Sequence, residues 1–228
     1  QTIFSTAPND NNKMMTGELF EVSENTLKVV GLDGHRIAIR NIALEGRADD
    51  VKVVVPGKTL QEISKILSTD AENMVNVYFT NNHILFEFDN TIVVSRLIEG
   101  EYFKISQMLS SDYETKVVIN KKEFIDSIDR ANLLITESEK KPIIINITDG
   151  SLEVNVNSSK GKSNENIDIK KEGKDLMIGF NPKFLMDALK VIDDETVDIY
   201  LVNPKAPCFI RDANQSYIYL ILPVNFTA

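Results

Sequence analysis

The 228-residue chain has few of the side chains on which enzymes and metal sites depend. Its single cysteine, Cys208, cannot form an internal disulfide, so a reducing cytoplasm is the expected compartment. Two histidines and one cysteine leave little material for a zinc site, and we expect no metal and no other cofactor. The ten glycines are scattered, mostly at turns, so the sequence has no glycine-rich phosphate-binding loop.

Long apolar runs are absent as well. The longest, 53–55 and 217–222, fall far short of the roughly 20 residues that cross a bilayer. No secretory leader precedes the first strand-like segment, and we expect no membrane partner. Hydrophobic residues make up 43% and charged residues 26% of the chain, as in ordinary globular proteins, which excludes a disordered or collagen-like chain.

Positive charge is in deficit. The chain has 25 Lys and Arg against 34 Asp and Glu, a net charge of −9. Over the whole surface this balance disfavours nucleic acid, because phosphate binding is driven by cations. The deficit is shared evenly, with −5 in residues 1–104 and −4 in residues 105–228. A single cationic face is still compatible with such a balance.

Strand-like segments dominate the rest of the sequence. The segments with β-branched or alternating composition are 18–22, 26–30, 36–42, 51–55, 75–79, 83–88, 92–97, 143–148, 152–156, 167–169, 176–180, 197–201, 208–211 and 217–224. Asp33-Gly34 and Asp149-Gly150 predict hairpin turns. Residues 1–7 resemble the end of a helix, and residues 157–166 are predicted to be a polar loop.

Apolar residues at helical spacing predict helices over 58–68, 122–135 and 183–192. Few helices among many hairpin-connected strands indicate an α+β fold, in which antiparallel sheets are covered by helices on one face.

The two halves of the sequence repeat with an offset near 125. Leu27 matches Leu152, and Lys58 and Lys65 match Lys183 and Lys190. A repeat of this length indicates tandem copies of one domain, which we place at 1–104 and 105–228. In both copies the lysines lie seven residues apart on one helical stripe, and an acidic residue, Glu62 or Asp187, shares that stripe. A solvent-facing helix surface is the simpler interpretation of these lysines, and contact with nucleic acid is the alternative.

Two other segments allow a functional or a structural interpretation. Asp33 could orient His35 toward a serine such as Ser95, as in a hydrolase, but no Gly-x-Ser-x-Gly motif supports this, and a hairpin turn is favoured. The final strand is apolar on both faces. It is either a central core strand or one wall of a groove that takes a peptide.

Three segments in register carry a resemblance to a known family. They are Asp33–Ala38, Ser95–Tyr102 and Tyr219–Val224, and together with the long repeat they resemble the bacterial DNA polymerase sliding clamp, the beta subunit of polymerase III. The resemblance implies tandem DNA-clamp domains with antiparallel sheets outside and helices lining an inner concave face. Residues 1–104 would be the second clamp domain, truncated at its N-terminus, and residues 105–228 the third.

The resemblance implies a replication processivity factor without enzymatic activity. Full-length family members form head-to-tail homodimeric rings that encircle duplex DNA independently of its sequence, whereas this fragment should not close a ring alone. The DNA-facing residues implied here are Asn9, Lys13, Lys58, Lys65, Lys121, Lys122, Lys183 and Lys190, of which Lys121 and Lys122, together with Arg130, are the weaker candidates. Leu133 and Leu134 match apolar ring-interface positions, although burial in the core would also explain them.

The resemblance also implies docking of polymerase III subunits, the clamp loader and repair polymerases. Each would insert a short motif, a Gln followed by apolar and aromatic residues, into a groove between the second and third domains. The implied wall residues are Met15, Leu32, Gly34, His35, Arg36, Ile37, Phe103, Gln107, Met108, Leu220, Leu222, Pro223 and Val224. Phe103 and Asn225 depart from the family pattern. The alternative function is a tandem-domain peptide-binding adaptor that does not act on DNA.

Overall fold

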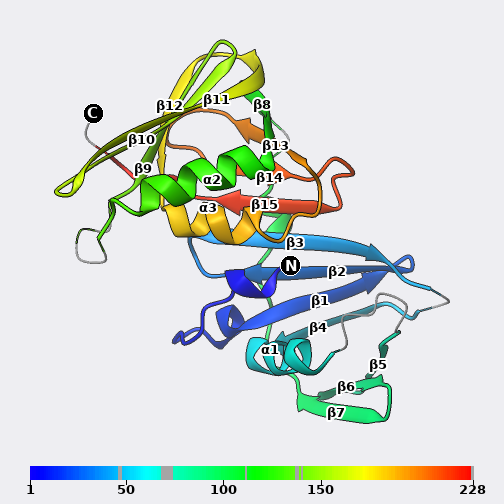
Figure 1. Cartoon of the computed structure of the whole chain (residues 1–228). Coiled ribbons are helices and arrows are strands. Elements are labelled where there is room, and N and C mark those ends of the chain that lie inside the picture. The colour runs from blue at the N-terminus through cyan, green and yellow to red at the C-terminus, as the bar shows by residue number, and fades with distance from the viewer. Residues whose placement is uncertain (46–47, 68–73, 111, 137–138, 140, 227–228) are drawn as a thin grey trace. The chain divides into compact units, whose positions relative to one another are not determined.

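The computed structural model describes residues 1–45, 48–67, 74–110, 112–136, 139 and 141–226. The chain forms two compact units. The N-terminal unit is Thr2–Met108, and the C-terminal unit is Leu109–Ala228 together with Gln1 (Figure 1). Each unit is described by itself.

The N-terminal unit contains a four-stranded antiparallel sheet in the order β3–β2–β1–β4. Its strands are β1 (Gly17–Ser23), β2 (Thr26–Leu32), β3 (Arg36–Ala43) and β4 (Val51–Pro56). Gly34 has a φ of +83° in the predicted turn between β2 and β3, a conformation that favours glycine. Before β1 lie two short 3₁₀ helices, η1 (Ile3–Ser5) and η2 (Lys13–Thr16), so the helix end expected over residues 1–7 is a single 3₁₀ turn.

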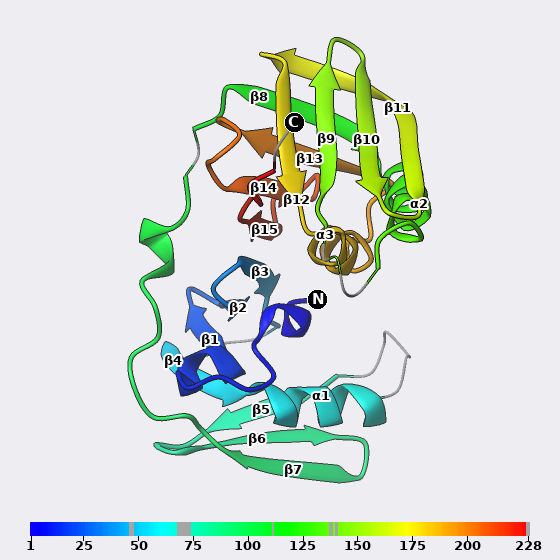
Figure 2. The same cartoon turned by 90° about the vertical axis from the view of Figure 1, so that its left-hand side faces the viewer.

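A separate three-stranded sheet completes the N-terminal unit. Helix α1 (Gly57–Ile66) precedes β5 (Asn76–Phe79), β6 (His83–Phe88) and β7 (Thr91–Arg96), which pair in that order. Residue 68, the predicted end of this helix, lies outside the described residues. Helix α1 lies along the three-stranded sheet (Figure 2), and Ile63 from the helix joins Ile84 and Phe86 in the core. A third 3₁₀ helix, η3 (Ile105–Gln107), follows.

The described residues of the C-terminal unit form eight strands in the order β12–β9–β10–β11–β8–β13–β14–β15. The strands are β8 (Thr115–Asn120), β9 (Ile143–Thr148), β10 (Ser151–Ser158), β11 (Gly161–Gly173), β12 (Leu176–Phe180), β13 (Thr196–Leu201), β14 (Cys208–Arg211) and β15 (Tyr217–Ile221). Strand β8 was not predicted, and the last strand ends at Ile221 rather than Val224.

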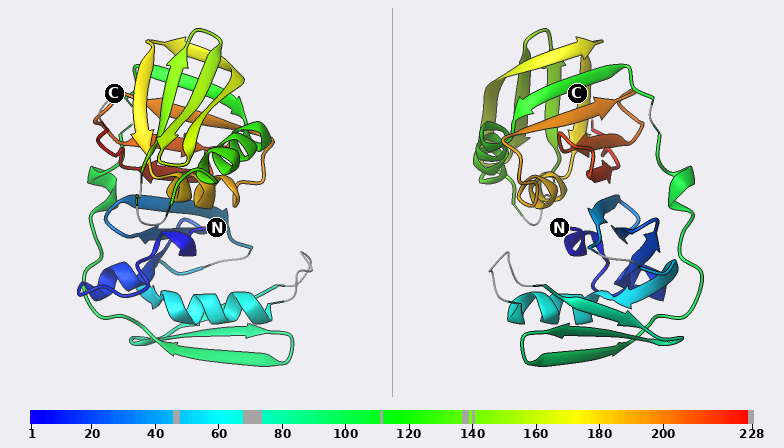
Figure 3. Two further views of the ribbon diagram at one scale, coloured as in Figure 1. Left: turned by 60° about the vertical axis from the view of Figure 1, so that its left-hand side comes forward. Right: turned by 90° about the vertical axis from the view of Figure 1, so that its right-hand side faces the viewer.

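Helices α2 (Lys121–Asn132) and α3 (Pro182–Leu189) pack against each other in this unit (Figure 3). Asn120 and Asn181 begin them as N-caps, because their side chains accept hydrogen bonds from the backbone N–H groups of Glu123 and Lys183. Both helices end earlier than predicted, at Asn132 and Leu189.

Strand β11 overturns the prediction of a polar loop over residues 157–166. Its first half pairs with β10, from Ser158↔Gly161 to Ser151↔Asp168, and its second half pairs with β8. Its side chains are mostly polar because one face is exposed and the other only half-buried. Backbone pairing and a tight turn therefore form the strand without an apolar pattern.

The internal repeat is confirmed in the order of the elements. The series β4–α1–β5–β6–β7 has the same order as β12–α3–β13–β14–β15. Lys58 and Lys183 are each the second residue of their helix.

Candidate nucleic-acid interface and peptide-docking residues

Helix α1 presents its lysines away from the core. Ile63 is buried, whereas Lys58 and Lys65 are exposed. The Lys65 ammonium Nζ lies 2.8 Å from Glu62 Oε1, an ion pair across one turn. This hydrogen bond, the charge of Lys65 and the weaker field of Lys58 lower the pKa of the Glu62 carboxyl. The stripe therefore carries two cations and one ionised carboxylate at neutral pH.

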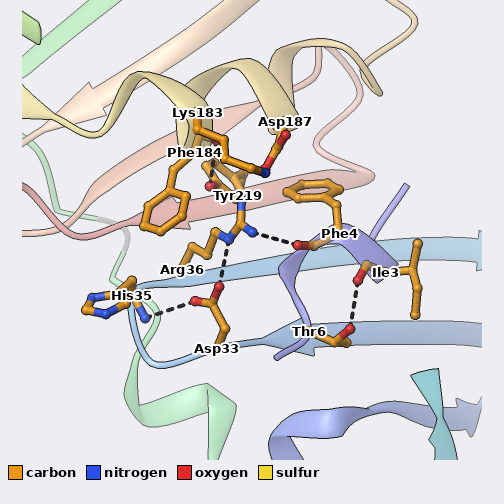
Figure 4. Close-up of polar contacts among 10 residues, drawn as sticks. All are labelled: Ile3, Phe4, Thr6, Asp33, His35, Arg36, Lys183, Phe184, Asp187 and Tyr219. Carbon is orange, nitrogen blue, oxygen red and sulfur yellow. Dashed lines mark hydrogen bonds and ion pairs between the residues drawn. The ribbon is translucent and has the colours of Figure 1, made fainter. Parts of the chain in front are cut away.

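Helix α3 repeats this arrangement. Lys183 and Lys190 are exposed, and Leu185 and Leu189 on the other side of the helix are buried. The Lys183 Nζ lies 2.7 Å from Asp187 Oδ2, and Figure 4 shows the two side chains turned toward each other. Among the residues that the structure describes, no ion pair involves Lys58 on α1 or Lys190 on α3.

The basic residues of α2 are more strongly committed to contacts within the unit. Lys121 is half-buried, and its ammonium donates to the Ile192 carbonyl oxygen at 2.5 Å. Lys122 pairs with Asp126 at 3.0 Å, and Arg130 pairs with Glu165 at 2.7 Å. Lys121 is thus poorly placed for an outside partner, while Lys122 remains exposed.

The loop before β1 carries the other two DNA-facing candidates. Asn9 and Lys13 are both exposed. The Asp10 and Asn12 side chains accept hydrogen bonds from the backbone N–H groups of Asn12 and Met14, at 2.7 and 3.1 Å. These short-range bonds hold the loop in a defined turn.

Arg36 is a structural anchor of the N-terminal unit (Figure 4). Its guanidinium donates to Asp33 Oδ2 at 2.9 Å and to the Phe4 carbonyl at 2.7 Å, and it lies 5.3 Å from the centre of the Phe4 ring. The backbone N–H of His35 donates to Asp33 Oδ1 at 3.1 Å. The side chain that the resemblance places in a peptide wall therefore also fastens η1 to the β2–β3 hairpin.

The remaining wall residues of the N-terminal unit lie in three regions: the β2–β3 hairpin, η2 and the segment after β7. Leu32 and Ile37 are buried on either side of the turn that holds exposed Gly34. Met15 is half-buried in η2. The other three follow β7. Phe103 is half-buried, and its ring meets that of Tyr102 edge to face, with the ring centres 5.5 Å apart. Gln107 and Met108 are exposed.

The C-terminal unit contributes the end of β15 and the residues after it. Leu220 is buried in the strand, and Leu222 and Val224 are each 39% exposed. Pro223 is half-buried between them. The Val224 N–H donates to the Gly179 carbonyl at 2.8 Å, so this segment crosses to β12 instead of extending β15.

The geometry does not assemble a serine hydrolase site. Asp33 is engaged by the Arg36 guanidinium and by the His35 backbone. The Ser95 hydroxyl lies 2.7 Å from the Thr59 hydroxyl. Cys208 is buried, and burial raises the pKa of its thiol far above the usual range, so it is a poor nucleophile.

The described residues offer neither a metal cluster nor a membrane-spanning helix. These residues contain no group of three or more His, Cys, Asp or Glu that could hold a metal ion. No helix in that part of the chain is both long enough and apolar enough to cross a membrane.

Leu133 and Leu134 follow the last residue of α2. Leu133 is 71% exposed, so the interpretation that both residues belong to the core is wrong for Leu133. Leu134 is half-buried.

Two contacts around the candidate residues were missed from the sequence. Phe4 holds Arg36 from 32 residues away, and no local pattern points to this pair. Gly179 leaves the space that Phe226 occupies, because a Cβ atom at residue 179 would lie 2.8 Å from Phe226 Cδ1. A glycine inside an apolar strand was the available signal, since it often marks a close approach of another segment.

Comparison with known proteins covers both units. The family model of the DNA polymerase III beta subunit, central domain, matches residues 1–104. The model of the same subunit's C-terminal domain matches residues 106–225.

A beta sliding clamp from Staphylococcus aureus is 34% identical to 99% of this chain, which covers 60% of that protein. Among solved structures, a Bacillus subtilis DNA polymerase sliding clamp is 33% identical, with a TM-score of 0.95 over 100% of this chain and 61% of its own. A crystal structure from Eubacterium rectale, provisionally described as a DNA polymerase III beta subunit, is 68% identical, with a TM-score of 0.97 over 100% of this chain and 62% of its own.

The chain thus spans about 60% of the length of the curated relatives that it matches. The two family models together cover nearly all of the sequence, in the order in which the domains are named. The chain belongs to the family of DNA polymerase III beta subunits.

Proposed function

We propose that this chain is the larger part of a replication processivity clamp, a ring that encircles duplex DNA and has no catalytic role of its own. Residues 1–104 would be its second domain and residues 105–228 its third. The observation that carries the proposal is the repeated lysine stripe. Exposed Lys58 and Lys65 on α1 match exposed Lys183 on α3 and Lys190, the C-cap residue directly after it. Family membership supports it.

The proposal accounts for a nucleic-acid partner in a protein with a net charge of −9. Duplex DNA carries a regular array of phosphates, and two separate helices with exposed lysines can contact them without reading the bases. A ring retains DNA by enclosing it, so each contact can be weak enough to allow sliding. Replication takes place on the chromosome, so the cytoplasm remains the expected compartment.

Duplex binding by the full chain tests the DNA-facing role. We expect a fluorescent duplex to bind at low salt, with an affinity that falls as salt rises. The double substitution Lys58→Glu and Lys190→Glu should abolish binding, because it removes the two stripe lysines that have no ion-pair partner among the described residues.

The matched control is the double substitution Lys160→Glu and Lys205→Glu. It reverses the charge of two exposed lysines that lie outside the helices. It changes the net charge by the same amount and should retain most of the binding. Equal loss in both double variants would show that only overall charge matters. A wild-type chain that does not bind DNA, yet binds peptides, would favour the adaptor alternative.

We further propose that polymerase III subunits, the clamp loader and repair polymerases dock through short peptides. The supporting observation in the C-terminal unit is the partly exposed apolar pair Leu222 and Val224, held in place by the hydrogen bond from Val224 to Gly179. In the N-terminal unit it is the exposed Met108 together with the firmly held hairpin of Asp33 and Arg36. Methionine adapts readily to varied partners.

A peptide with a Gln followed by apolar and aromatic residues should bind the chain with a Kd in the micromolar range. Leu222→Asp should weaken that binding by more than tenfold, because an unpaired carboxylate would be buried against the peptide. Val94→Asp is the control, since Val94 is an even more exposed apolar residue on β7. Isothermal titration calorimetry measures both, and an unchanged Kd for Leu222→Asp would contradict the docking role.

The full-length protein would form a head-to-tail homodimeric ring, with Leu133 and Leu134 at the contact. The 71% exposure of Leu133 supports an outward-facing role. Leu133→Asp in the full-length protein should therefore shift sedimentation from dimer to monomer. Unchanged dimerisation would remove these two residues from the interface.

A further inference from the structure

The two lysine stripes share a carboxylate as well as lysines. The α1 stripe is Lys58, Glu62 and Lys65, and the α3 stripe is Lys183, Asp187 and Lys190, both at positions i, i+4 and i+7. On a helix of 3.6 residues per turn these positions lie within an arc of about 60°. Each acidic side chain is thus on the same line as the two lysines that flank it.

The carboxylate is paired with a different lysine in the two helices. On α1, Glu62 holds the lysine that follows it, Lys65, at 2.8 Å. On α3, Asp187 holds the lysine that precedes it, Lys183, at 2.7 Å. The outcome is the same, because one lysine of each stripe is neutralised and the other is left without an ion-pair partner among the described residues.

The pairs are exposed rather than built into the core. The side chains of Lys65, Glu62 and Lys183 are 60 to 70% exposed in round terms, and Asp187 is the most covered of the four. Exposed ion pairs of this kind contribute little to the stability of a helix, because solvent screens them. A phosphate group that approaches the stripe can therefore replace the carboxylate as the partner of the lysine at small cost to the fold.

We propose that Glu62 and Asp187 limit the affinity of this protein for duplex DNA, by occupying one lysine of each stripe in competition with the DNA phosphates. This inference rests on the proposed clamp function and deepens it. The two carboxylates set how strongly the helices hold DNA, so that the duplex can pass from one phosphate to the next. The high exposure of Glu62 separates this role from any role in the core.

The physical reason is the competition between two anions for one ammonium group. While Lys65 or Lys183 is paired internally, a phosphate must displace a carboxylate that is covalently held close by. Once the carboxylate charge is lost, the lysine can contact a DNA phosphate, and this contact releases a counterion from the DNA. Each additional phosphate contact makes the salt dependence of log K steeper by up to about 0.9.

The test compares wild type with Glu62→Gln, Asp187→Asn and the double variant in duplex-binding titrations from about 50 to 200 mM salt. Each released lysine should raise affinity on the order of tenfold at about 50 mM salt and about threefold at about 200 mM, because K scales with salt to the power of about −0.9. Circular dichroism should show unchanged helix content.

Glu99→Gln is the matched control. Glu99 pairs with Arg96 at 3.0 Å, also three residues apart and highly exposed, but on the segment that follows β7 rather than on a helix. It alters the net charge by the same single unit. If Glu62→Gln and Asp187→Asn bind no better than Glu99→Gln, or bind more weakly than wild type, the inference is overturned.

A second variant assigns the effect to the lysine. Adding Lys65→Ala to Glu62→Gln should return both the affinity and the salt slope to the wild-type values. If the gain persists without Lys65, the inference is also wrong. Failure of wild type and of every carboxylate variant to bind duplex would instead remove the proposed DNA-facing role itself, which distinguishes the two failures.

Discussion

The two units share one series of five elements, β4–α1–β5–β6–β7 and β12–α3–β13–β14–β15, but their cores are built differently. In the C-terminal unit, β8 pairs with both β11 and β13, and two helices pack side by side against the sheet. Among the described residues of the N-terminal unit, β5–β6–β7 remains a separate sheet, and α1 is its only α-helix. Tyr78, Ile92 and Val94 are exposed on the face of that small sheet opposite to its core. The same order of elements is therefore compatible with two differently built cores.

The largest expected difference comes from the same substitution in the two helix layers. Ile128 on α2 is 0% exposed and Ile63 on α1 is 4% exposed. We expect Ile128→Ala to lower the free energy of unfolding by about 4 kcal/mol and Ile63→Ala by about 2 kcal/mol. The cavity beside a single helix can collapse more easily than the one beneath two packed helices.

Urea unfolding followed by circular dichroism measures the loss, and hydrogen exchange assigns it to a unit. In wild type, the amides of β5–β7 should exchange faster than those of β8 and β13. Equal losses for the two isoleucines would show that the two helix layers resist cavity formation alike.

A buried carboxyl group in the N-terminal unit has no counterpart at the matching position of the C-terminal unit. Glu18 on β1 pairs with Val55, whereas in the repeat Ile143 on β9 pairs with Phe180 at the same offset. Glu18 is buried, and its Oε1 has no hydrogen-bond partner among the described residues. Burial raises the pKa of Glu18 to about 7, against the lowering effect of a hydrogen bond from Thr2.

The N-terminal unit should therefore lose stability as pH rises. The folded state keeps the Glu18 proton up to a pH of about 7, whereas the unfolded chain releases it above about 4.5. The full stability is present below pH 4.5, falls between 4.5 and 7, and is lower by about 3 kcal/mol above that range.

Glu18→Gln, which cannot ionise, should abolish this dependence and make the unit more stable than wild type at pH 8. Urea titrations at pH 5 and pH 8 provide the measurement. A pH dependence that persists in Glu18→Gln would assign the effect to another group.

Most of the fold follows from local patterns, and the failures have identifiable causes. Four strands, at 83–88, 143–148, 176–180 and 208–211, match the structure to the residue, because their apolar residues face a core and turns bound them. The polar half of β11 could not be found in this way, since its pairing with β10 depends on the backbone. The last strand was extended too far because Leu222 to Val224 are apolar, yet they cross to β12.

For the candidate residues, helical spacing correctly predicted that Lys58, Lys65, Lys183 and Lys190 are exposed; their contact with DNA stays a prediction. Spacing could not predict which lysine each carboxylate would hold, because positions i−4 and i+3 are equally within reach on a helix. The position of Arg36 was equally hidden, since its partner Phe4 lies 32 residues away.

The smallest expected effect concerns the segment that leaves the last strand of each unit. It crosses to the strand that precedes the helix and makes one backbone hydrogen bond there. Ile98 N–H donates to Val54 O at 2.9 Å in the N-terminal unit, and Val224 N–H donates to Gly179 O at 2.8 Å in the C-terminal unit. The side chain present at residue 54 is missing at residue 179.

Gly179→Val gives residue 179 the same side chain as Val54, its counterpart in the N-terminal unit. A Cβ atom at residue 179 would lie 2.8 Å from both Phe226 Cδ1 and Val224 O, so the tail must move and its hydrogen bond should break. We expect a loss of about 1 kcal/mol, the net contribution of one hydrogen bond, with faster exchange of the Val224 amide. Adding Phe226→Ala should restore part of the protection, because it removes the ring that the new side chain meets. If the Val224 amide stays as protected in Gly179→Val as in wild type, the tail does not depend on the missing side chain, and the two crossings are equivalent despite their different residues.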